Sequence, residues 1–387
     1  MSRPDFLYMI VWALPLIILQ FFSLDFFLKI DGETYFLIVS NILSFFLIYK
    51  LCKLYMNNNH KKKILQFDKQ KISAFFKLFF SFWLFFYLVT IIYSGGMPLI
   101  WIIKGSTKTY DEFGVPTLTG LLNMIRAFLS VLCLIMWIDH KNKIYFYGLI
   151  FFIFSSFVLE ANRGGGLVLL LHPIGYYFLT RPLSIKKIFI SVFFSFILLL
   201  FLGAMEQYRY IRNDKYDIKE KYENLNISNS APSTLQIYML PAILYITTPI
   251  QNLNNTIINH STPTYFPYYT FSALLPTVIR DKIYNVDQKD YGDLLSESYN
   301  TTSYYTPLIR DFGTFSTFFI VLLFQFIISI VHIKAKLTNQ YFYNLIFPVL
   351  FMCILLTPFN LYFTSLVTVL YPVITYMFIH LKKIVLR

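Results

Sequence analysis

The stretch LTGLLNMIRAFLSVLCLIMWI, residues 118–138, decides the fold class of this protein. It is as long as the helix of about 20 residues that crosses the hydrocarbon core of a bilayer, and Arg126 is its only charged residue. Similar apolar stretches recur along the whole chain, and only 14% of all residues are charged, against about 25% in soluble proteins. The sequence therefore predicts an all-α, polytopic integral membrane protein.

Ten apolar stretches predict about ten transmembrane helices in a single transmembrane domain, residues 1–387. When the directions of these spans alternate, every lysine-rich connection falls on one side, which holds more than half of the 33 Lys and Arg. Because such connections stay in the cytoplasm, both termini are expected to be cytoplasmic. The predicted spans are Phe6–Phe27, Phe36–Leu51, Ala74–Tyr93, Leu118–Ile138, Tyr145–Glu160, Leu167–Thr180, Ile188–Met205, Thr314–Ile333, Tyr343–Leu356 and Leu361–His380.

The net charge of +13 is explained by this topology, so no nucleic-acid partner is expected. The three cysteines are far apart and lie in or beside apolar stretches, a pattern without a disulfide framework or metal-ligand spacing. The sequence Asp31-Gly32-Glu33 is the nearest approach to an acidic metal motif, and it has the composition of a turn. We therefore expect no metal and no other cofactor.

One large hydrophilic connection, residues 206–311, lies between predicted spans 7 and 8 and is placed outside the cytoplasm. From residue 205 to 306 the chain holds 14 of the 30 Tyr but only two of the 43 Phe. Tyrosine combines an apolar ring with a polar tip, so this composition suits a surface that meets water and sugar. Two moderately apolar segments, Ser233–Pro249 and Tyr268–Ile279, are expected to form short interfacial helices within the loop.

Arginine and lysine are distributed differently. Lysine dominates the cytoplasmic connections, whereas six of the nine arginines fall in the membrane or on the outer side. A guanidinium stays charged and grips phosphate oxygens bidentately, so the outer arginines suit recognition of a diphosphate. The alternative for each of them is an ion pair with an acid of the loop, or contact with lipid headgroups. The six are Arg126, Arg163, Arg209, Arg212, Arg280 and Arg310.

Arg126 lies about eight residues into its predicted helix, which is roughly 12 Å below the membrane surface. An intramembrane charge marks a functional site by default, and the alternative is a structural pair with Glu160 or Asp25. Glu160 and Arg163 are also close enough in sequence to pair with each other.

The triplet Gly164-Gly165-Gly166 directly follows Arg163. Glycines let the backbone approach a ligand closely, and amide groups at the start of a helix can bind an anion, although a tight turn has the same composition. At the end of the large loop, Arg310 could meet phosphate, and Asp311 could take a proton from a sugar hydroxyl or simply cap a helix. Glu206, His260 and Asp281 are other candidate bases.

In order and placement, these motifs resemble the O-antigen or oligosaccharide repeat-unit polymerases (Wzy-type) over roughly residues 95–360. The residues that carry the resemblance are Gly95-Gly96-Met97-Pro98, Val115-Pro116, Arg163-Gly164, Arg209, Leu275-Pro276 and Asp311-Phe312-Gly313.

The resemblance implies a glycosyltransferase of the bacterial inner membrane that polymerises undecaprenyl-diphosphate-linked oligosaccharide repeat units at the outer face. Its partners would be that lipid-linked oligosaccharide, the membrane lipids and a chain-length regulator protein. Under this hypothesis the catalytic residues are Asp311 as the base, with Arg209 and Arg163 at the diphosphate. The substrate-binding residues would be Arg126, Arg212, Arg280, Arg310, Gly164, Gly165 and Tyr210.

Other functional classes stay open at this point. An O-antigen ligase, or another outer-face glycosyltransferase, would use the same donor with a different acceptor. A polysaccharide flippase or transporter would move the lipid-linked unit without making a bond, and it would more often show two similar halves. A non-catalytic scaffold would explain neither the distribution of arginine nor the long outer loop.

Overall fold

The structure of this protein is a computed structural model. It describes residues 3–21, 27–56, 67–181, 234–259, 262–275, 279–280, 282, 293–295, 301–338 and 340–380. Throughout this part of the chain the secondary structure is helical and no strand is formed.

Helices lie over nine of the ten predicted spans, and the remaining span, 188–205, is outside the described residues. They are α1 (Pro4–Phe21), α2 (Gly32–Met56), α3 (Lys69–Ser94), α5 (Leu118–His140), α6 (Lys143–Phe154) with the π-helical turn η2 (Ser155–Leu159), α7 (Arg163–Thr180), α13 (Tyr305–Leu337), α14 (Tyr341–Leu355) and α15 (Leu366–His380).

Four stretches of the described chain are long and apolar enough to cross a membrane. They are Gly32–Met56, Lys69–Ile103, Leu118–His140 and Tyr305–Leu337. The others are shorter apolar helices, such as α14 and α15 with 15 residues each. The prediction of an all-helical protein with transmembrane helices is thereby confirmed in its general form, while the number of spans stays a prediction.

Five further elements connect these helices: α4 (Pro98–Ile103), η1 (Tyr110–Glu112), α10 (Thr234–Asn259), α11 (Tyr268–Ser272) and η3 (Tyr362–Thr364). α10 ends ten residues beyond the predicted helix Ser233–Pro249, and its second half is buried against α1, α2 and α13. α11 is only five residues long, where a longer helix was expected.

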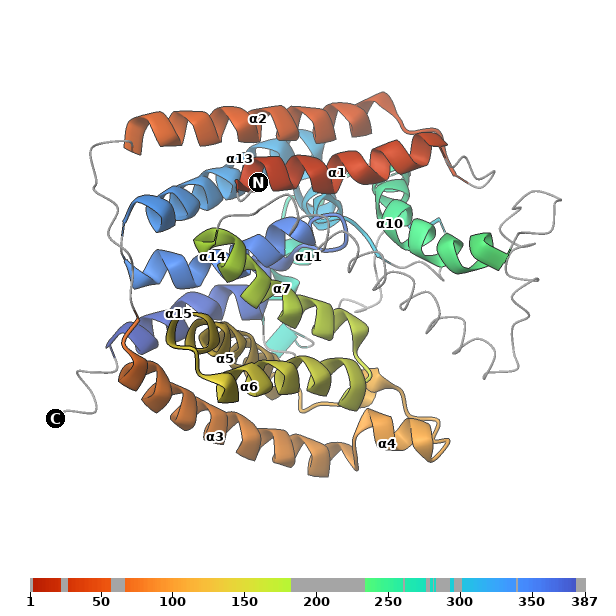
Figure 1. Ribbon diagram of the computed structural model, residues 1–387. Helices are drawn as coiled ribbons and strands as arrows, with labels where there is room; N and C mark the ends of the chain where they lie inside the picture. The colour runs from red at the N-terminus through yellow and green to blue at the C-terminus, as the bar shows by residue number, and fades with distance from the viewer. Residues whose placement is uncertain are drawn as a thin grey trace.

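The helices form a bundle whose members alternate in direction (Figure 1). The end of α2 and the start of α3 lie at one end of the bundle, and α4 and α10 lie at the other. At the first end Lys71, at the start of α3, donates to the carbonyl of Ile379 at the end of α15, and Arg181 pairs with Asp139 at 2.9 Å. These are termini that the alternating topology assigns to the cytoplasmic side, so the fold and the alternating topology agree.

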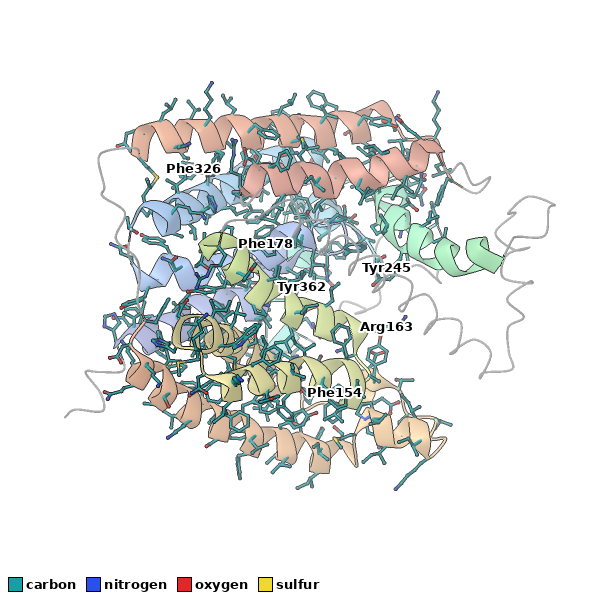
Figure 2. The ribbon with its side chains drawn as sticks, viewed as in Figure 1. Phe154, Arg163, Phe178, Tyr245, Phe326 and Tyr362 are labelled. Atoms are coloured by element: carbon teal, nitrogen blue, oxygen red, sulfur yellow. The ribbon has the colours of Figure 1, made fainter. Side chains whose placement is uncertain are left out.

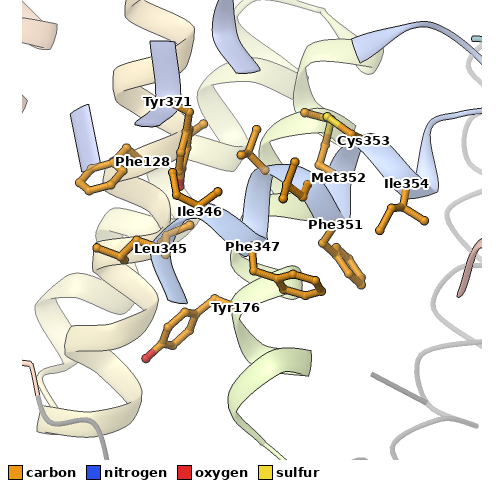
Figure 3. Packing of buried hydrophobic residues seen from close by; sticks show 14 of the residues in the cluster. Phe128, Tyr176, Leu345, Ile346, Phe347, Phe351, Met352, Cys353, Ile354 and Tyr371 are labelled. Atoms are coloured by element: carbon orange, nitrogen blue, oxygen red, sulfur yellow. The ribbon is translucent and has the colours of Figure 1, made fainter. Parts of the chain in front are cut away.

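The centre of the bundle is formed by α5 and α14. Every residue from 124 to 136 in α5 and from 344 to 354 in α14 is buried. A helix that is apolar all round and buried all round belongs at the middle of a bundle. Figure 3 shows Phe128 of α5 beside Tyr371 of α15, and Phe347 beside Phe351 on α14.

α2 shows the opposite pattern, because only one of its faces is buried. Leu37, Asn41, Phe45 and Tyr49 recur at the spacing of one helical face and pack inward. Leu43, Leu47, Leu51 and Leu54 are more than half exposed. An exposed apolar stripe of this length on an outer helix is the surface expected to face lipid.

Candidate functional site

The charged residue of the central helix is engaged by a carboxylate. Nη1 of Arg126 donates to Oε1 of Glu160 at 2.6 Å, and Nη2 donates to Oε2 at 3.1 Å. The same guanidinium donates to Asn123 at 2.7 Å and to Ser155 at 3.3 Å. The Arg126 side chain is only 3% exposed. Of the two partners proposed for Arg126 from the sequence, the structure selects Glu160.

Glu160 ends an unusual turn of the chain. The segment Ser155–Leu159, directly before Glu160, is π-helical. Ala161, directly after Glu160, has a left-handed backbone with φ of 50°. Short π-helical turns and left-handed non-glycine residues are uncommon and often occur at functional sites. Asn162 then caps α7 by accepting the N–H of Gly165 at 2.8 Å. We call residues 160–163 the 160–163 corner.

The glycine triplet follows Arg163 in the first turn of α7, and its residues differ in the space around them. A side chain at Gly166 would lie 2.6 Å from the ring of Phe157, so glycine is required there for the corner to pack against the π-helical turn. Gly164 is exposed, and a side chain there would have only an ordinary contact at 3.8 Å. The part of the triplet that remains open to a ligand is therefore its first residue.

Arg163 is the first residue of α7 and is half-buried. Figure 2 shows Arg163 at the end of α7 that lies toward α4 and α10, on the same side of the bundle as Tyr245 of α10. Glu160 and Arg163 do not lie on one continuous helix, because the left-handed Ala161 separates them. The carboxylate of Glu160 accepts both of its bidentate hydrogen bonds from Arg126.

A second group of polar residues lies where the chain enters α13. The carboxylate of Asp311 is fully buried and accepts the backbone N–H of Tyr269 at 3.0 Å and of Thr270 at 2.6 Å. The hydroxyl of Thr264 adds a third hydrogen bond at 3.2 Å. Asp311 therefore caps the start of α11, a different helix from the one in which it lies. Its role as a catalytic base stays a prediction, and its geometry is that of an anchor.

Arg310 lies beside this anchor. Its guanidinium carbon is 3.6 Å from the centre of the Tyr269 ring, a close cation–π contact. The backbone of residues 264–265 pairs with that of residues 310–311 through N–H groups at 3.0 and 2.8 Å. Gly313, with φ of 77°, then breaks the helical geometry within α13. Arg310 is thus held by its neighbours in a defined, half-buried position.

The two groups are at the same end of the bundle. The N–H of Leu366, at the start of α15, donates to the carbonyl of Ala273 just after α11. Leu366 also lies beside Gly120 of α5, about two helical turns before Arg126. The starts of α5, α7 and α15 and the whole of α11 therefore gather at one end. This is the end that the topology assigns to the outer side.

The remaining predicted residues are placed less fully. Arg280 is half-buried. Arg209, Arg212 and Tyr210 lie outside the described residues, as do Glu206, His260 and Asp281.

A run of amide side chains on α10 holds neighbouring segments together, a role that the sequence patterns did not predict. Gln251 binds both the N–H and the carbonyl of Leu28, at 3.0 and 3.1 Å, and Asn254 accepts the N–H of Asp31 at 2.7 Å. Asn252 binds the N–H of Leu295 and the carbonyl of Thr301. α10 therefore ties the connection between α1 and α2 to the segment that leads into α13. The signal was present as the sequence QNLNN, residues 251–255, inside an otherwise apolar helix.

A cluster of tyrosine hydroxyls was missed as well. The hydroxyl of Tyr8 lies 2.6 Å from those of both Tyr304 and Tyr305, and all three side chains are buried. Trp12 donates to the hydroxyl of Thr357 at 3.0 Å, and the N–H of Tyr304 donates to the carbonyl of the same residue. The N-terminal helix therefore holds the point at which the large loop returns to the bundle. A pair of adjacent tyrosines was the only signal in the sequence.

Comparisons of the chain with protein-family models, with curated proteins and with solved structures find no match. The function is therefore argued from the chemistry of the site. At the end of the bundle that the predicted topology assigns to the outer side, Arg163 is half-buried beside the exposed Gly164, and Arg310 is half-buried against the ring of Tyr269. Such an arrangement can bind the oxygens of an anionic ligand and stack against a sugar.

Proposed function

We propose that this protein polymerises undecaprenyl-diphosphate-linked oligosaccharide repeat units at the outer face of the bacterial inner membrane. In this reaction the anomeric carbon of the growing glycan forms a bond with a terminal sugar hydroxyl of a new lipid-linked unit. The bond from the anomeric carbon to the diphosphate oxygen breaks, the diphosphate leaves with the bonding electrons, and the hydroxyl gives up its proton. Both substrates are tethered to the membrane, so proximity supplies part of the rate.

The observation that carries the proposal is that two arginines, Arg163 and Arg310, lie at the same end of an apolar helical bundle. Arg163 begins α7 behind a buried, ion-paired corner, and Arg310 is held against Tyr269. Positioned cations aimed at a developing charge are worth more in a water-poor site than in water. The leaving diphosphate is the group that develops that charge, and Arg163, Arg310 and Arg280 are the described residues to which we assign it. Arg209 and Arg212 belong to the same proposal on the basis of the sequence alone.

Asp311 has a different role in this proposal. Its two oxygens already accept three hydrogen bonds, so its contribution is to hold α11 and thereby Tyr269 and Arg310. The proton of the acceptor hydroxyl then passes to another base or to a phosphate oxygen of the leaving group. The chain-length regulator protein remains a proposed partner, expected at the outer end of the bundle.

Deletion of the gene tests the proposal, followed by electrophoresis of the surface glycan and of its lipid-linked precursors. A surface glycan that collapses to single repeat units identifies the polymerase. Long polymer that accumulates on the lipid carrier identifies a ligase. Lipid-linked units retained on the cytoplasmic side identify a flippase, and an unchanged ladder contradicts all three functions.

A further inference from the structure

We infer that Arg126 and Glu160 form a positioning pair that fixes the 160–163 corner against the central helix and so sets where Arg163 and Gly164 meet the substrate. The inference rests on the proposed function for the identity of that substrate. It assigns to Arg126 a role through other residues, in place of the direct substrate contact expected from the sequence.

The hydrogen bonds of Arg126 leave it little capacity for a ligand. A guanidinium has five N–H groups. Four hydrogen bonds go to Glu160, Asn123 and Ser155, and Nε is buried without a partner among the described residues. A diphosphate could reach Arg126 only after Glu160 had been displaced from it.

The position of Glu160 makes the pair a mechanical link. Arg126 belongs to the stretch of α5 that is buried on all sides, so it is fixed in the core of the bundle. Glu160 is the first residue of the corner, and Arg163 is the last. The backbone between them turns at Ala161, which holds a left-handed conformation that only surrounding contacts can maintain in a non-glycine residue.

Two backbone hydrogen bonds and one cap complete the corner. The N–H of Glu160 donates to Ser155 at 2.9 Å, and the N–H of Asn162 donates to Ser156 at 3.1 Å. The side chain of Asn162 then caps α7 at Gly165. The Arg126–Glu160 pair ties the first residue of the corner to α5 through a buried bidentate contact at 2.6 and 3.1 Å, so its loss should let the corner shift relative to the central helix.

A labelling experiment measures the position of the corner without reference to catalysis. The full-length protein would carry Gly164→Cys, a site where a side chain has room, and a membrane-impermeant maleimide would be the probe. The natural cysteines Cys52, Cys133 and Cys353 are buried and give a low background. We expect Glu160→Gln to change the labelling rate at least 5-fold. The matched control is Asp139→Asn, which breaks the Arg181–Asp139 pair at the opposite end and should leave the rate unchanged.

Reversal of the pair separates positioning from substrate contact. In the double variant Arg126→Glu with Glu160→Arg, an ion pair can form again, and a positioning role predicts a labelling rate within about 2-fold of the parent and recovery of most polymer formation. A substrate contact by Arg126 predicts instead that the double variant is less active than Glu160→Gln, because a carboxylate then faces the diphosphate. Arg126→Lys, which retains the charge but not the bidentate geometry, should be intermediate in both measurements.

The outcomes decide the inference in either direction. A labelling rate that is the same in Glu160→Gln as in the parent overturns the positioning role, whatever the activity. A changed rate that the double variant restores supports it. If the rate responds as expected but gene deletion leaves the glycan ladder unchanged, the pair positions the corner and the proposed function is wrong.

Discussion

The buried carboxylate of Asp311 provides the sharpest test of how this site is built. If it is an anchor for α11, its replacement should destabilise the protein in proportion to the hydrogen bonds that are lost. If it is the catalytic base, its replacement should abolish activity with the fold intact. Asp311→Asn and Asp311→Ala distinguish these two roles.

The expected magnitudes follow from the three hydrogen bonds. In Asp311→Ala the N–H of Thr270, which is 3% exposed, loses its acceptor, and a buried unsatisfied donor costs about 1–3 kcal/mol. The N–H of Tyr269 is at a half-buried residue, where water can partly replace the carboxylate. These two N–H groups are the capped groups of α11, and loss of a cap costs about 0.5–2 kcal/mol, so we expect Asp311→Ala to lower the free energy of unfolding by about 2–3 kcal/mol.

Asp311→Asn should cost less, about 1–2 kcal/mol, since one oxygen remains to accept a hydrogen bond. Denaturant unfolding of the purified protein in detergent gives the stabilities, and the rate of polymer formation in proteoliposomes gives the activity. We expect the Asn variant to keep activity within about 10-fold of the parent once the folded fraction is taken into account.

A base in proton transfer contributes about 100- to 10,000-fold to the rate. Loss of activity by 100-fold or more in Asp311→Asn, at unchanged stability, would therefore refute the anchor role and restore Asp311 as the base. Thr317→Ala is a suitable control, because it removes a buried hydroxyl of α13 that donates to the carbonyl of Gly313 in the same helix at 2.8 Å.

Three further predictions follow from single contacts. Gly166→Ala should lower the free energy of unfolding by about 1–3 kcal/mol, because the added methyl group would lie 2.6 Å from the Phe157 ring, whereas Gly164→Ala should be tolerated. Thermal unfolding of both variants checks this, and equal midpoints would contradict it. Tyr8→Phe should cost about 1–3 kcal/mol, since its hydroxyl serves Tyr304 and Tyr305, while Tyr147→Phe at a position 66% exposed should have no effect in the same unfolding assay. The orientation in the membrane predicts that Lys104→Cys reacts with an impermeant maleimide in intact spheroplasts and that Lys141→Cys reacts only after permeabilisation. The reverse pattern would show that the protein has the opposite orientation.

The chemical role of each candidate site residue was harder to read from the sequence than the helices were. Arg126 was identified because a charge inside an apolar helix is costly and rare. Whether it met a ligand or a carboxylate depended on Glu160, which is 34 residues away and on another element. Asp311 was expected to act as the catalytic base or to cap a helix, and the structure shows it capping α11, 41 residues earlier in the chain.

The positions of the helices could be predicted from the apolar runs in the sequence. A run of about 20 apolar residues can satisfy its backbone groups in a membrane only as a helix, so local sequence was sufficient to predict the helices that lie over nine of the ten predicted spans. The positions of lysine and arginine predicted that successive spans alternate in direction, and the helices of the bundle alternate in Figure 1.

The tertiary structure alone decided which apolar helix lies inside. α2 and α5 have similar hydropathy, yet α5 is buried almost throughout and α2 on one face only. Lipid tails and protein interiors are equally apolar, so hydrophobicity cannot tell a central helix from a peripheral one. Packing and the pairing of buried polar groups make that distinction. Arg126 is buried because the carboxylate of Glu160, from a turn 34 residues away, pairs with it. No local pattern in the sequence encodes that contact.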